Sequence, residues 1–496
     1  MPRQRALSIL MVGSEAVPFA KTGGLADVLS GLPAALVALG HRVTLVLPRY
    51  KGMPSDGASV EIPVPIAGAA APTRFIDRPL GERNRVVLVD RPELYERDAL
   101  YGTADEDYPD NALRFGFLSR AALEYARRST KPFDVLHAHD WQAGLAPVYL
   151  RRLYADDPHL HAMASVLTIH NLAYQGIFPS ETMPTLDLPW DLFTLDGLEY
   201  WGGMSFLKGG ITFSDVITTV SPTHAKEIQT NEYGFGFEDI LARRADDLYG
   251  ILNGIDTDRW NPSKDPFLPE PYDADHLEGK EAAKRELLDL IGPQTSADHP
   301  RRPLIAMISR MVGQKGLDLI AAAADRLPNL PANFVVLGTG EERYEDVWRN
   351  LAASYPDRVA AHIGFDERLA HVIEAAADIF LMPSRFEPCG LNQMYSMRYG
   401  TVPVVRSTGG LADTVADYNP RTGKGTGFVF AEYAPEALLG ALERALEAFR
   451  RPKIWRHVQR TGMRQDFSWD RSAREYVKLY KRALDSRSKG EGQGQT

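Results

Sequence analysis

Three basic residues, Lys21, Arg310 and Lys315, suggest the chemistry of this chain, because each lies beside a glycine-containing turn or just after an apolar run. Two or three fixed cations, together with backbone amides, can neutralise a departing phosphate without a metal ion. Taken alone, each of these residues could equally be an ordinary solvated charge on the surface. As a group, the three favour a ligand that carries a diphosphate.

The hexapeptide Thr-Gly-Gly-Leu-Ala-Asp occurs twice, at Thr22–Asp27 and at Thr408–Asp413. Each copy follows a short apolar run and precedes a predicted helix. The first backbone N–H groups of a helix are unpaired and the helix dipole is positive there, so such turns bind anions. Two of them predict two related α/β domains that close on a phosphorylated ligand.

Polar residues follow several of the predicted strands. In open parallel sheets, ligands bind at the carboxyl ends of the strands, so side chains at these positions are candidates for a site. A turn or a surface position explains each residue equally well on its own. Their shared placement favours a site made of His139, Asp140, His170, Asn171, Asn253, Glu387 and Cys389.

Apolar strands that alternate with helical segments predict parallel sheets with crossover helices. The first series comprises residues 7–12, 43–47, 86–89, 135–139, 166–169 and 216–220, and the second 304–308, 334–337, 361–363, 379–382 and 402–405. The helix after the first turn carries leucines and valines on one face and stops at Gly40. We therefore expect two doubly wound domains.

The domain boundary is predicted in a loop rich in proline, aspartate and asparagine. We expect an N-terminal domain over residues 1–252, a second domain over 253–467 and a terminal helix over 468–485. Residues 486–496 are polar and glycine-rich, which predicts a disordered tail.

Composition limits the classes of partner. The chain has 496 residues, a net charge of −9 and one cysteine, Cys389. An acidic chain does not suit general nucleic-acid or anionic-membrane binding. The lone cysteine excludes intrachain disulfides and cysteine-rich zinc sites, and no apolar run approaches the ~20 residues of a membrane span. We expect a cytoplasmic protein with no nucleic-acid or membrane partner.

Two other ligand classes compete with the metal-free diphosphate. Acidic triplets at 105–107, 256–258 and 273–275 could hold a metal, but none ends a clear strand. A dinucleotide site would need G-x-G-x-x-G after the first strand, and only Gly338 and Gly340 give a weak match. We expect no metal and no cofactor.

Six motifs in order resemble the bacterial glycogen synthase and plant starch synthase family: Lys21–Val28, His137–Trp141, Ile169–Gly176, Leu252–Asp256, Gln314–Asp318 and Ser384–Leu391. The resemblance runs from Leu7 to about Trp469. It implies an α/β GT-B glycosyltransferase fold with two Rossmann-like domains, a deep cleft between them and a C-terminal helix that crosses back to the first domain. The implied activity is metal-independent transfer of glucose from ADP-glucose to the non-reducing end of an α-1,4-glucan such as glycogen, with retention of configuration.

The resemblance also implies roles for individual residues. Glu387, His170, Arg310, Lys315 and Asp140 would be catalytic, with Glu387 on the glucose hydroxyls and the two cations on the diphosphate. The predicted substrate-binding residues are Lys21, Gly23, Gly24, Asp27, Asn171, Asn253, Cys389, Gly390, Leu391 and Phe365. No covalent role is expected for Cys389.

Some positions leave alternatives open. Tyr395 stands where many retaining GT-B enzymes have a second glutamate, and Asn392 stands where the bacterial enzymes usually have threonine, so a contact to phosphate there could differ. Phe365 could stack on adenine or belong to the core. A UDP-glucose-dependent synthase and a catalytically degenerate glucan-binding protein remain the alternative functions.

Overall fold

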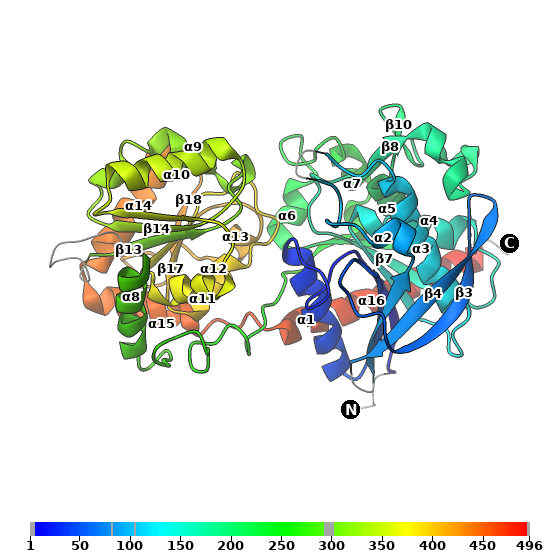
Figure 1. The fold of residues 1–496 in the computed structure, drawn as a ribbon, viewed down its shortest axis with the longest axis horizontal. Coiled ribbons are helices and arrows are strands. Elements are labelled where there is room, and N and C mark those ends of the chain that lie inside the picture. The colour runs from blue at the N-terminus through cyan, green and yellow to red at the C-terminus, as the bar shows by residue number, and fades with distance from the viewer. Residues whose placement is uncertain (1–4, 81–82, 104–105, 292–301, 494–496) are drawn as a thin grey trace. The chain divides into compact units, whose positions relative to one another are not determined.

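The computed structural model describes residues 5–80, 83–103, 106–291 and 302–493, which form two compact units (Figure 1). Unit 1 comprises Met1–Val220, Ala225–Gly254 and Trp469–Thr496, and unit 2 comprises Ser221–His224 and Ile255–Ser468. Apart from the short segment Ser221–His224, the chain passes from unit 1 to unit 2 after Gly254 and returns at Trp469.

Unit 1 is built on a sheet with the order β12-β11-β7-β6-β1-β2-β5-β4-β3. Its strands are β1 (Ser8–Val12), β2 (Arg42–Pro48), β3 (Ala58–Ile66), β4 (Ala69–Pro79), β5 (Asn84–Asp90), β6 (Val135–His139), β7 (Ala164–Ile169), β11 (Val216–Thr219) and β12 (Leu248–Gly250). β1 pairs in parallel with β2 and with β6, with Ile9 opposite both Val43 and Val135. The six strands expected from the sequence are all present.

The edge of this sheet differs from the expected all-parallel arrangement. β3 and β4 form a long antiparallel hairpin, and β4 pairs antiparallel with β5. The first four residues of β3 are exposed, and both strands contain proline. The hairpin therefore lacks the continuous apolar run that is typical of a buried parallel strand. A second, small antiparallel sheet contains β8 (Ile177–Pro179), β9 (Glu199–Tyr200) and β10 (Gly203–Ser205).

The helices of unit 1 are α1 (Gly24–Ala38), α2 (Pro92–Tyr95), α3 (Asn111–Arg127), α4 (Leu145–Arg152), α5 (Phe206–Phe213), α7 (Glu238–Arg243) and α16 (Trp469–Gln493). α6 (Pro222–Glu227) begins in the short segment assigned to unit 2 and ends in unit 1. In α1, Leu25, Leu29 and Leu32 recur at helical spacing and are buried. The chain leaves this helix through Gly40, whose φ of 96° suits glycine.

Unit 2 contains a six-stranded, fully parallel sheet with the order β15-β14-β13-β16-β17-β18. Its strands are β13 (Leu304–Ile308), β14 (Asn333–Gly338), β15 (Val359–Ile363), β16 (Ile379–Met382), β17 (Val402–Arg406) and β18 (Phe428–Phe430). Its helices are α8 (Glu278–Ile291), α9 (Leu317–Ala323), α10 (Glu342–Ser354), α11 (Glu367–Ala376), α12 (Asn392–Arg398), α13 (Gly409–Thr414), α14 (Pro435–Phe449) and α15 (Pro452–Met463). This strand order is that of a Rossmann-like domain, so the predicted fold is confirmed.

The C-terminal helix α16 belongs to unit 1 and packs on α1 and β7. A Cβ on Gly31 of α1 would lie 2.0 Å from the Trp469 indole, so glycine is required for this contact. Farther along, the Tyr480 hydroxyl lies 2.8 Å from His137 Nδ1 of β6. The helix also continues to Gln493, where the sequence predicts a disordered tail from residue 486. Extending an established helix costs less than starting one, which accounts for the added turns; residues 494–496 lie outside the described part of the chain.

Candidate active site

In each of the two large sheets the strand order reverses at one point, and predicted site residues gather there. In unit 1 the reversal lies between β1 and β6, and in unit 2 between β13 and β16. Loops that leave the carboxyl ends of such neighbouring strands diverge and leave a ligand crevice. Glu15, the first glycine turn and Asp140 follow β1 and β6, while Lys315 and Glu387 follow β13 and β16.

An ion pair between buried Glu387 and partly exposed Lys315 forms the centre of the unit 2 site. Lys315 Nζ lies 2.8 Å from Oε1 and 2.6 Å from Oε2 of Glu387. Ser384 Oγ donates a third hydrogen bond, 2.9 Å long, to Glu387 Oε2. Glu387 is buried, so its carboxylate charge is stabilised by these donors and held in one orientation.

Glycines allow the loops around this ion pair to approach closely. Gly316 has a φ of 79°, and a Cβ there would lie 2.1 Å from the Pro383 carbonyl oxygen. Gly409 has a φ of 44°, and its Cβ would lie 2.0 Å from the Glu387 carbonyl oxygen. A side chain at either position would push apart the loops that carry Lys315 and Glu387.

The second glycine turn therefore has a structural role that the sequence did not predict. The Gly410 amide donates to the Glu387 carbonyl at 3.0 Å, and a Cβ on Gly410 would meet the Cys389 carbonyl at 2.0 Å. The turn and its short helix α13 exist as predicted, but the Gly410 amide binds protein backbone. This turn fixes the loop of Glu387 and Cys389 from behind.

Gly390 and Leu391 lie at the start of α12, where Gly390 has a φ of 70°. The Asn392 side chain points inward and donates from Nδ2 to the Ile308 carbonyl of β13 at 2.8 Å. Cys389, the one cysteine of the sequence, is buried. The departure noted at position 392 thus joins α12 to the end of β13.

Two other predicted unit 2 residues are exposed. Phe365, between β15 and α11, is 86% exposed, so the core alternative for this ring is wrong. Arg310 is also exposed, and no carboxylate of the described residues lies within ion-pair distance of it. Both side chains are accessible to a ligand.

The first glycine turn contains an internal carboxylate that sequence reasoning missed. Buried Glu15 accepts hydrogen bonds from the Thr22 hydroxyl at 2.6 Å and from the Gly23 amide at 3.3 Å, and also binds the Thr22 amide and the Tyr101 hydroxyl. The missed signal is its position three residues after β1. Glu15 uses part of the anion-binding capacity of this turn.

Lys21 and Asp27 flank the first glycine turn and pair with each other, with Lys21 Nζ 2.7 Å from Asp27 Oδ1. Both side chains are partly exposed. The ion pair is therefore weak, and an anionic ligand can compete for the lysine.

Asp140 joins the end of β6 to the end of β7. Its Oδ1 accepts the His170 amide at 2.7 Å and the Asn171 amide at 3.5 Å. Its backbone φ of 56° and ψ of −171° are unusual for a residue other than glycine. Burial, assisted by the charge of Glu15, raises the pKa of the Asp140 carboxyl to about 7.

Three histidines lie beside Asp140, of which His137 and His139 are buried and His170 is partly exposed. His139 Nδ1 lies 3.0 Å from His170 Nε2, and His137 contacts Thr168 and Tyr480. Burial lowers the pKa of His137 and of His170 to about 3, and lowers that of His139 well below its usual value. These imidazoles are neutral near pH 7, so they act as hydrogen-bonding groups and not as cations.

Among the buried polar atoms of the described residues that have no hydrogen-bond partner, two belong to predicted site residues of unit 1: Nε2 of His139 and Oδ1 of Asn253. Buried polar groups are nearly always satisfied in folded proteins. Unsatisfied atoms on two of the predicted site residues are available to a ligand or to water.

No group of three or more His, Cys, Asp or Glu side chains in the described ranges is arranged to hold a metal ion. The two acidic triplets that the structure describes form turns: Asp256 accepts the amides of Asp258 and Arg259, and Asp273 accepts those of Asp275 and His276. Asp105, from the third triplet, lies outside the described residues.

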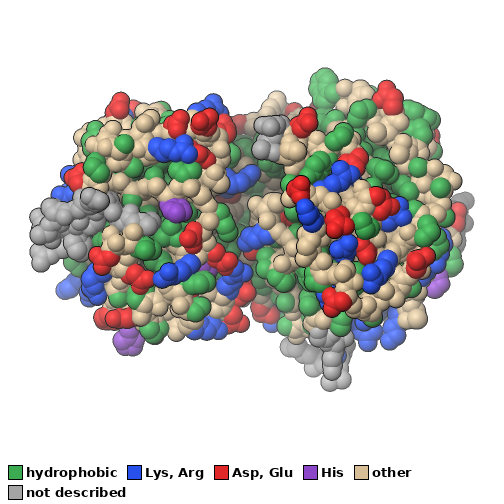
Figure 2. All heavy atoms as spheres, viewed as in Figure 1, with side chains coloured by type: hydrophobic (Ala, Val, Ile, Leu, Met, Phe, Trp, Pro, Cys, Tyr) green, Lys and Arg blue, Asp and Glu red, His purple; other side chains and the backbone are tan. Residues whose placement is uncertain are grey.

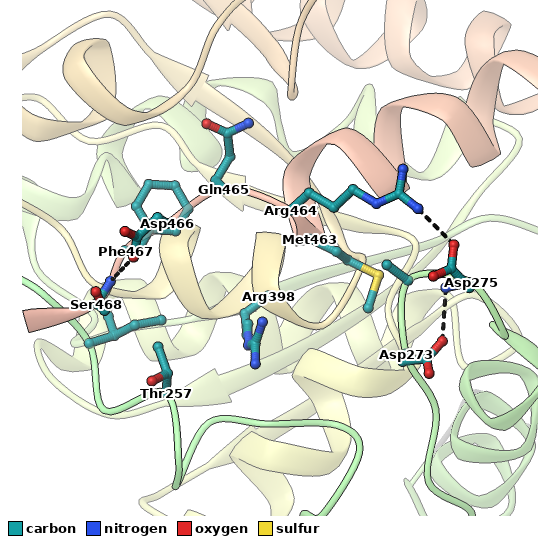
Figure 3. A pocket seen from close by; sticks show the side chains of 12 residues that line it. Thr257, Asp273, Asp275, Arg398, Met463, Arg464, Gln465, Asp466, Phe467 and Ser468 are labelled. Carbon is teal, nitrogen blue, oxygen red and sulfur yellow. Dashed lines mark hydrogen bonds and ion pairs between the residues drawn. The ribbon is translucent and has the colours of Figure 1, made fainter. Parts of the chain in front are cut away.

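A cavity of about 560 Å³ lies elsewhere in unit 2 (Figure 3). Arg464 pairs with Asp275 at 2.7 Å on its wall, and the Ser468 amide binds Asp466. None of the predicted site residues lines it. It is separate from the Lys315–Glu387 pair.

The structure thus groups the predicted residues within each unit. Unit 1 brings together Asp140, His170 and Asn171, with Glu15 and the first glycine turn close to Asp140. Unit 2 brings together Lys315 and Glu387 with the start of α12. Among the described helices, none has the length and hydropathy of a membrane span.

Two family models match the chain. The starch synthase catalytic domain matches residues 8–243, and glycosyl transferases group 1 matches residues 293–457. The chain is 46% identical to a glycogen synthase of Koribacter versatilis (strain Ellin345), with 97% of this chain and 99% of the relative covered. It is 48% identical to a glycogen synthase of Anaeromyxobacter dehalogenans (strain 2CP-C), with 96% and 99% covered.

Solved structures agree with this result. The catalytic domain of starch synthase IV from Arabidopsis thaliana, bound to ADP and acarbose, superposes with a TM-score of 0.88 at 35% identity, covering 97% of this chain and 100% of that one. Sucrose-phosphate synthase from Thermosynechococcus elongatus shares the fold, with a TM-score of 0.60 at 17% identity. With its two Rossmann-like units and relatives along nearly its whole length, the chain belongs to the glycogen synthase and starch synthase family of glycosyltransferases.

Proposed function

We propose that this glycosyltransferase moves glucose from ADP-glucose to the non-reducing end of an α-1,4-glucan, with retention of the α-configuration and release of ADP. The observation that carries the proposal is the buried Glu387 carboxylate, held by Lys315 and Ser384 at the reversal point of the unit 2 sheet. The 46% identical glycogen synthase, aligned over nearly the full length, supports the same reaction. We place the reaction in the cytoplasm, where a nucleotide sugar is available.

The bond changes balance without a co-reactant. The bond between glucose C1 and the phosphate oxygen breaks, and a bond forms between C1 and the acceptor O4. The acceptor proton passes to the departing phosphate oxygen on the same face. Positive charge develops at the sugar and negative charge on ADP, and the enzyme must stabilise both.

We assign binding of the donor, ADP-glucose, to residues whose charged side chains or backbone amides are accessible. Arg310 and Lys315 would neutralise the diphosphate, assisted by the start of α12 at Gly390 and Leu391. Lys21 would contact the same phosphates after leaving Asp27, and the Gly23 amide would exchange Glu15 for phosphate. Phe365 would stack on the adenine.

Sugar binding is assigned to the rigid polar groups. Glu387 would accept hydrogen bonds from glucose hydroxyls, and its fixed charge would favour the positive transition state. Asp140, His170, Asn171 and Asn253 would line the sugar pocket. The neutral state of His170 suits contact with a sugar, because it can accept or donate a hydrogen bond at neutral pH.

The direct test measures nucleoside diphosphate release from ADP-glucose and from UDP-glucose, with and without glycogen, in EDTA. We expect ADP release that requires glycogen and survives EDTA. Faster release from UDP-glucose would replace the proposed donor. Loss of activity in EDTA that Mg²⁺ restores would contradict metal independence. Glycogen binding without release from either donor would identify a degenerate binding protein.

Phe365→Ala should raise the KM for ADP-glucose roughly three- to tenfold, the range expected for one lost aromatic stacking contact, and should change kcat little. Because the ring is exposed, its removal leaves the core intact. Steady-state kinetics with varied ADP-glucose give both constants, and Phe365→Tyr is the matched control that keeps the stack. An unchanged KM in the alanine variant would remove Phe365 from the adenine site.

A further inference from the structure

Three aromatic rings of unit 2 are stacked around Trp260. The centroid of the Trp260 ring lies 3.9 Å from that of His371 and 3.9 Å from that of Tyr395, with interplanar angles of 6° and 13°. Two parallel rings at this distance would overlap if they shared one face of the indole, so Trp260 lies between the other two. We call these three residues the aromatic stack. Stacked ring pairs stabilise a contact beyond the area that they bury, so Trp260 joins α11, which carries His371, to α12, which carries Tyr395.

A hydrogen-bonded carboxylate fixes the same part of the chain. Residues 251–277, which carry Trp260 and join β12 to α8, are loop and turns throughout, so their position depends on side-chain contacts. Buried Asp265 lies 2.7 Å through Oδ2 from His371 Nδ1 and accepts a hydrogen bond from the Tyr399 hydroxyl. Burial raises the pKa of Asp265, but these two hydrogen bonds outweigh it and the pKa is lowered. The segment thus holds the His371 ring by its face and by its edge.

The surface contact of this segment is weaker. Arg259 pairs with Glu367, the first residue of α11, and both side chains are more than 40% exposed. Figure 2 shows acidic and basic side chains interspersed on the face of unit 2 where α11 lies in Figure 1. Ion pairs between such exposed groups contribute little to stability. The aromatic stack and Asp265 therefore hold the segment on α11 more firmly than this ion pair does.

Tyr395 connects the aromatic stack to the start of α12. Its amide donates to the Leu391 carbonyl at 3.0 Å, so the buried ring lies one helical turn from the residue that begins the helix. Many retaining GT-B enzymes have a second glutamate at this position, and here the position holds a ring that packs on Trp260. A displacement of Tyr395 would move the Gly390 and Leu391 amides, to which we assign a contact with the donor diphosphate.

We propose that Trp260 is a positioning residue for the donor. By stacking between His371 and Tyr395, it fixes the start of α12 in the orientation that receives the diphosphate of the nucleotide sugar. The inference rests on the proposed function, because it takes the start of α12 to be part of the donor site. The Lys315–Glu387 pair has its own hydrogen bonds, so loss of the stack should affect donor binding and leave the reacting centre intact.

Trp260→Leu removes the stack and keeps an apolar side chain. We expect the Kd for ADP, by calorimetry, and the KM for ADP-glucose to rise about tenfold, as loss of stacked ring pairs would cause. kcat and KM for glycogen should stay within about twofold of wild type, because the lost contact serves binding of one substrate. Trp260→Phe keeps a ring between the same neighbours and should restore most of the ADP affinity. Tyr395→Leu breaks the stack from the other side and should weaken ADP binding as Trp260→Leu does, which keeps the test available if the first variant fails to fold.

Trp455→Leu is the matched control. Trp455 is a buried tryptophan of the same unit, and its ring is stacked with Phe428 at an interplanar angle of 15°. The control variant should lose stability in urea and keep the wild-type Kd for ADP.

Wild-type affinity for ADP in folded Trp260→Leu or Tyr395→Leu would overturn the proposal. Equal weakening in Trp455→Leu would overturn it too, because the effect would then be general destabilisation. Titrations with UDP run beside those with ADP, since the start of α12 would bind the diphosphate that both share, and the ratio of variant to wild-type Kd tests the stack whichever base is preferred. Wild-type protein that binds neither nucleotide would refute the proposed function itself, an outcome distinct from equal binding by wild type and variant.

Discussion

Glu387→Gln should lower kcat by about a hundred- to a thousandfold or more, the cost typical of removing one preorganised electrostatic contact from a transition state. The substitution preserves the shape of the side chain and removes the charge that Lys315 and Ser384 hold in place. The positive charge that develops on the glucose would lose its fixed counter-charge. Binding of ADP alone should change little, since ADP lacks the glucose that Glu387 is proposed to contact.

The measurement is single-turnover ADP release at saturating ADP-glucose and glycogen, together with ADP affinity by calorimetry. Asp378→Asn is the matched control: Asp378 is a partly exposed carboxylate of the same unit, paired with Lys284 at 2.6 Å, just before the amino end of β16. Glu387 follows the carboxyl end of that strand. Removing the Asp378 charge should cost stability and leave kcat unchanged. A Glu387→Gln enzyme with kcat near the wild-type value would remove this residue from the catalytic site.

Asp140→Ala should lower kcat/KM about a hundredfold, because the His170 and Asn171 amides lose the acceptor that positions them, and small displacements in a site are that costly. Asp140→Asn keeps an oxygen at the same place and should stay within about tenfold of wild type. Asp140→Gly removes the acceptor and also relieves the positive φ of 56°. It should be as inactive as the alanine variant and more stable.

The same carboxyl makes stability depend on pH. Burial raises its folded-state pKa from 3.8 to about 7, so the folded state holds the proton more tightly than the unfolded state does. Its favourable contribution is complete below about pH 4 and is lost as pH rises towards 7. A shift of this size corresponds to about 4 kcal/mol at most.

Urea unfolding of wild type and Asp140→Asn at pH 5 and pH 8 measures this effect. The asparagine variant should gain stability relative to wild type at pH 8, and the gain should shrink at pH 5. An equal difference at both pH values would contradict a raised pKa. Comparable losses of kcat/KM in the asparagine and alanine variants would show that the charge itself acts in the reaction, beyond positioning.

The sequence predicts the central strands well, because a buried strand requires apolar residues that are visible as a short run in the sequence. β1, β13 and β16 are short and largely apolar, β6 is short and fully buried, and polar residues at the carboxyl ends of these strands coincide with the reversal points of the two sheets. The antiparallel β3–β4 hairpin has no such apolar run, because the first residues of β3 are exposed and show little alternation of apolar and polar side chains.

The details that were missed arise from how loops fold back onto other parts of the chain. Glu15 becomes part of the first glycine turn because the loop after β1 folds back and places it against Thr22 and Gly23. The second glycine turn has the same sequence, but its Gly410 amide meets the Glu387 carbonyl. Identical hexapeptides thus have different partners, and no local pattern distinguishes them. The exposure of Phe365 likewise depends on where the loop after β15 lies.

The return of α16 to unit 1 sets an order of events during synthesis. β6, which ends one residue before Asp140, has its His137 side chain bonded to Tyr480, more than three hundred positions later. While a ribosome is still making unit 2, the face of the first sheet that α16 will cover remains open to water and to chaperones. Unit 2 can bury its own core at that stage, whereas unit 1 completes its core only after the last helix emerges. The first half of the polypeptide is therefore the last to mature.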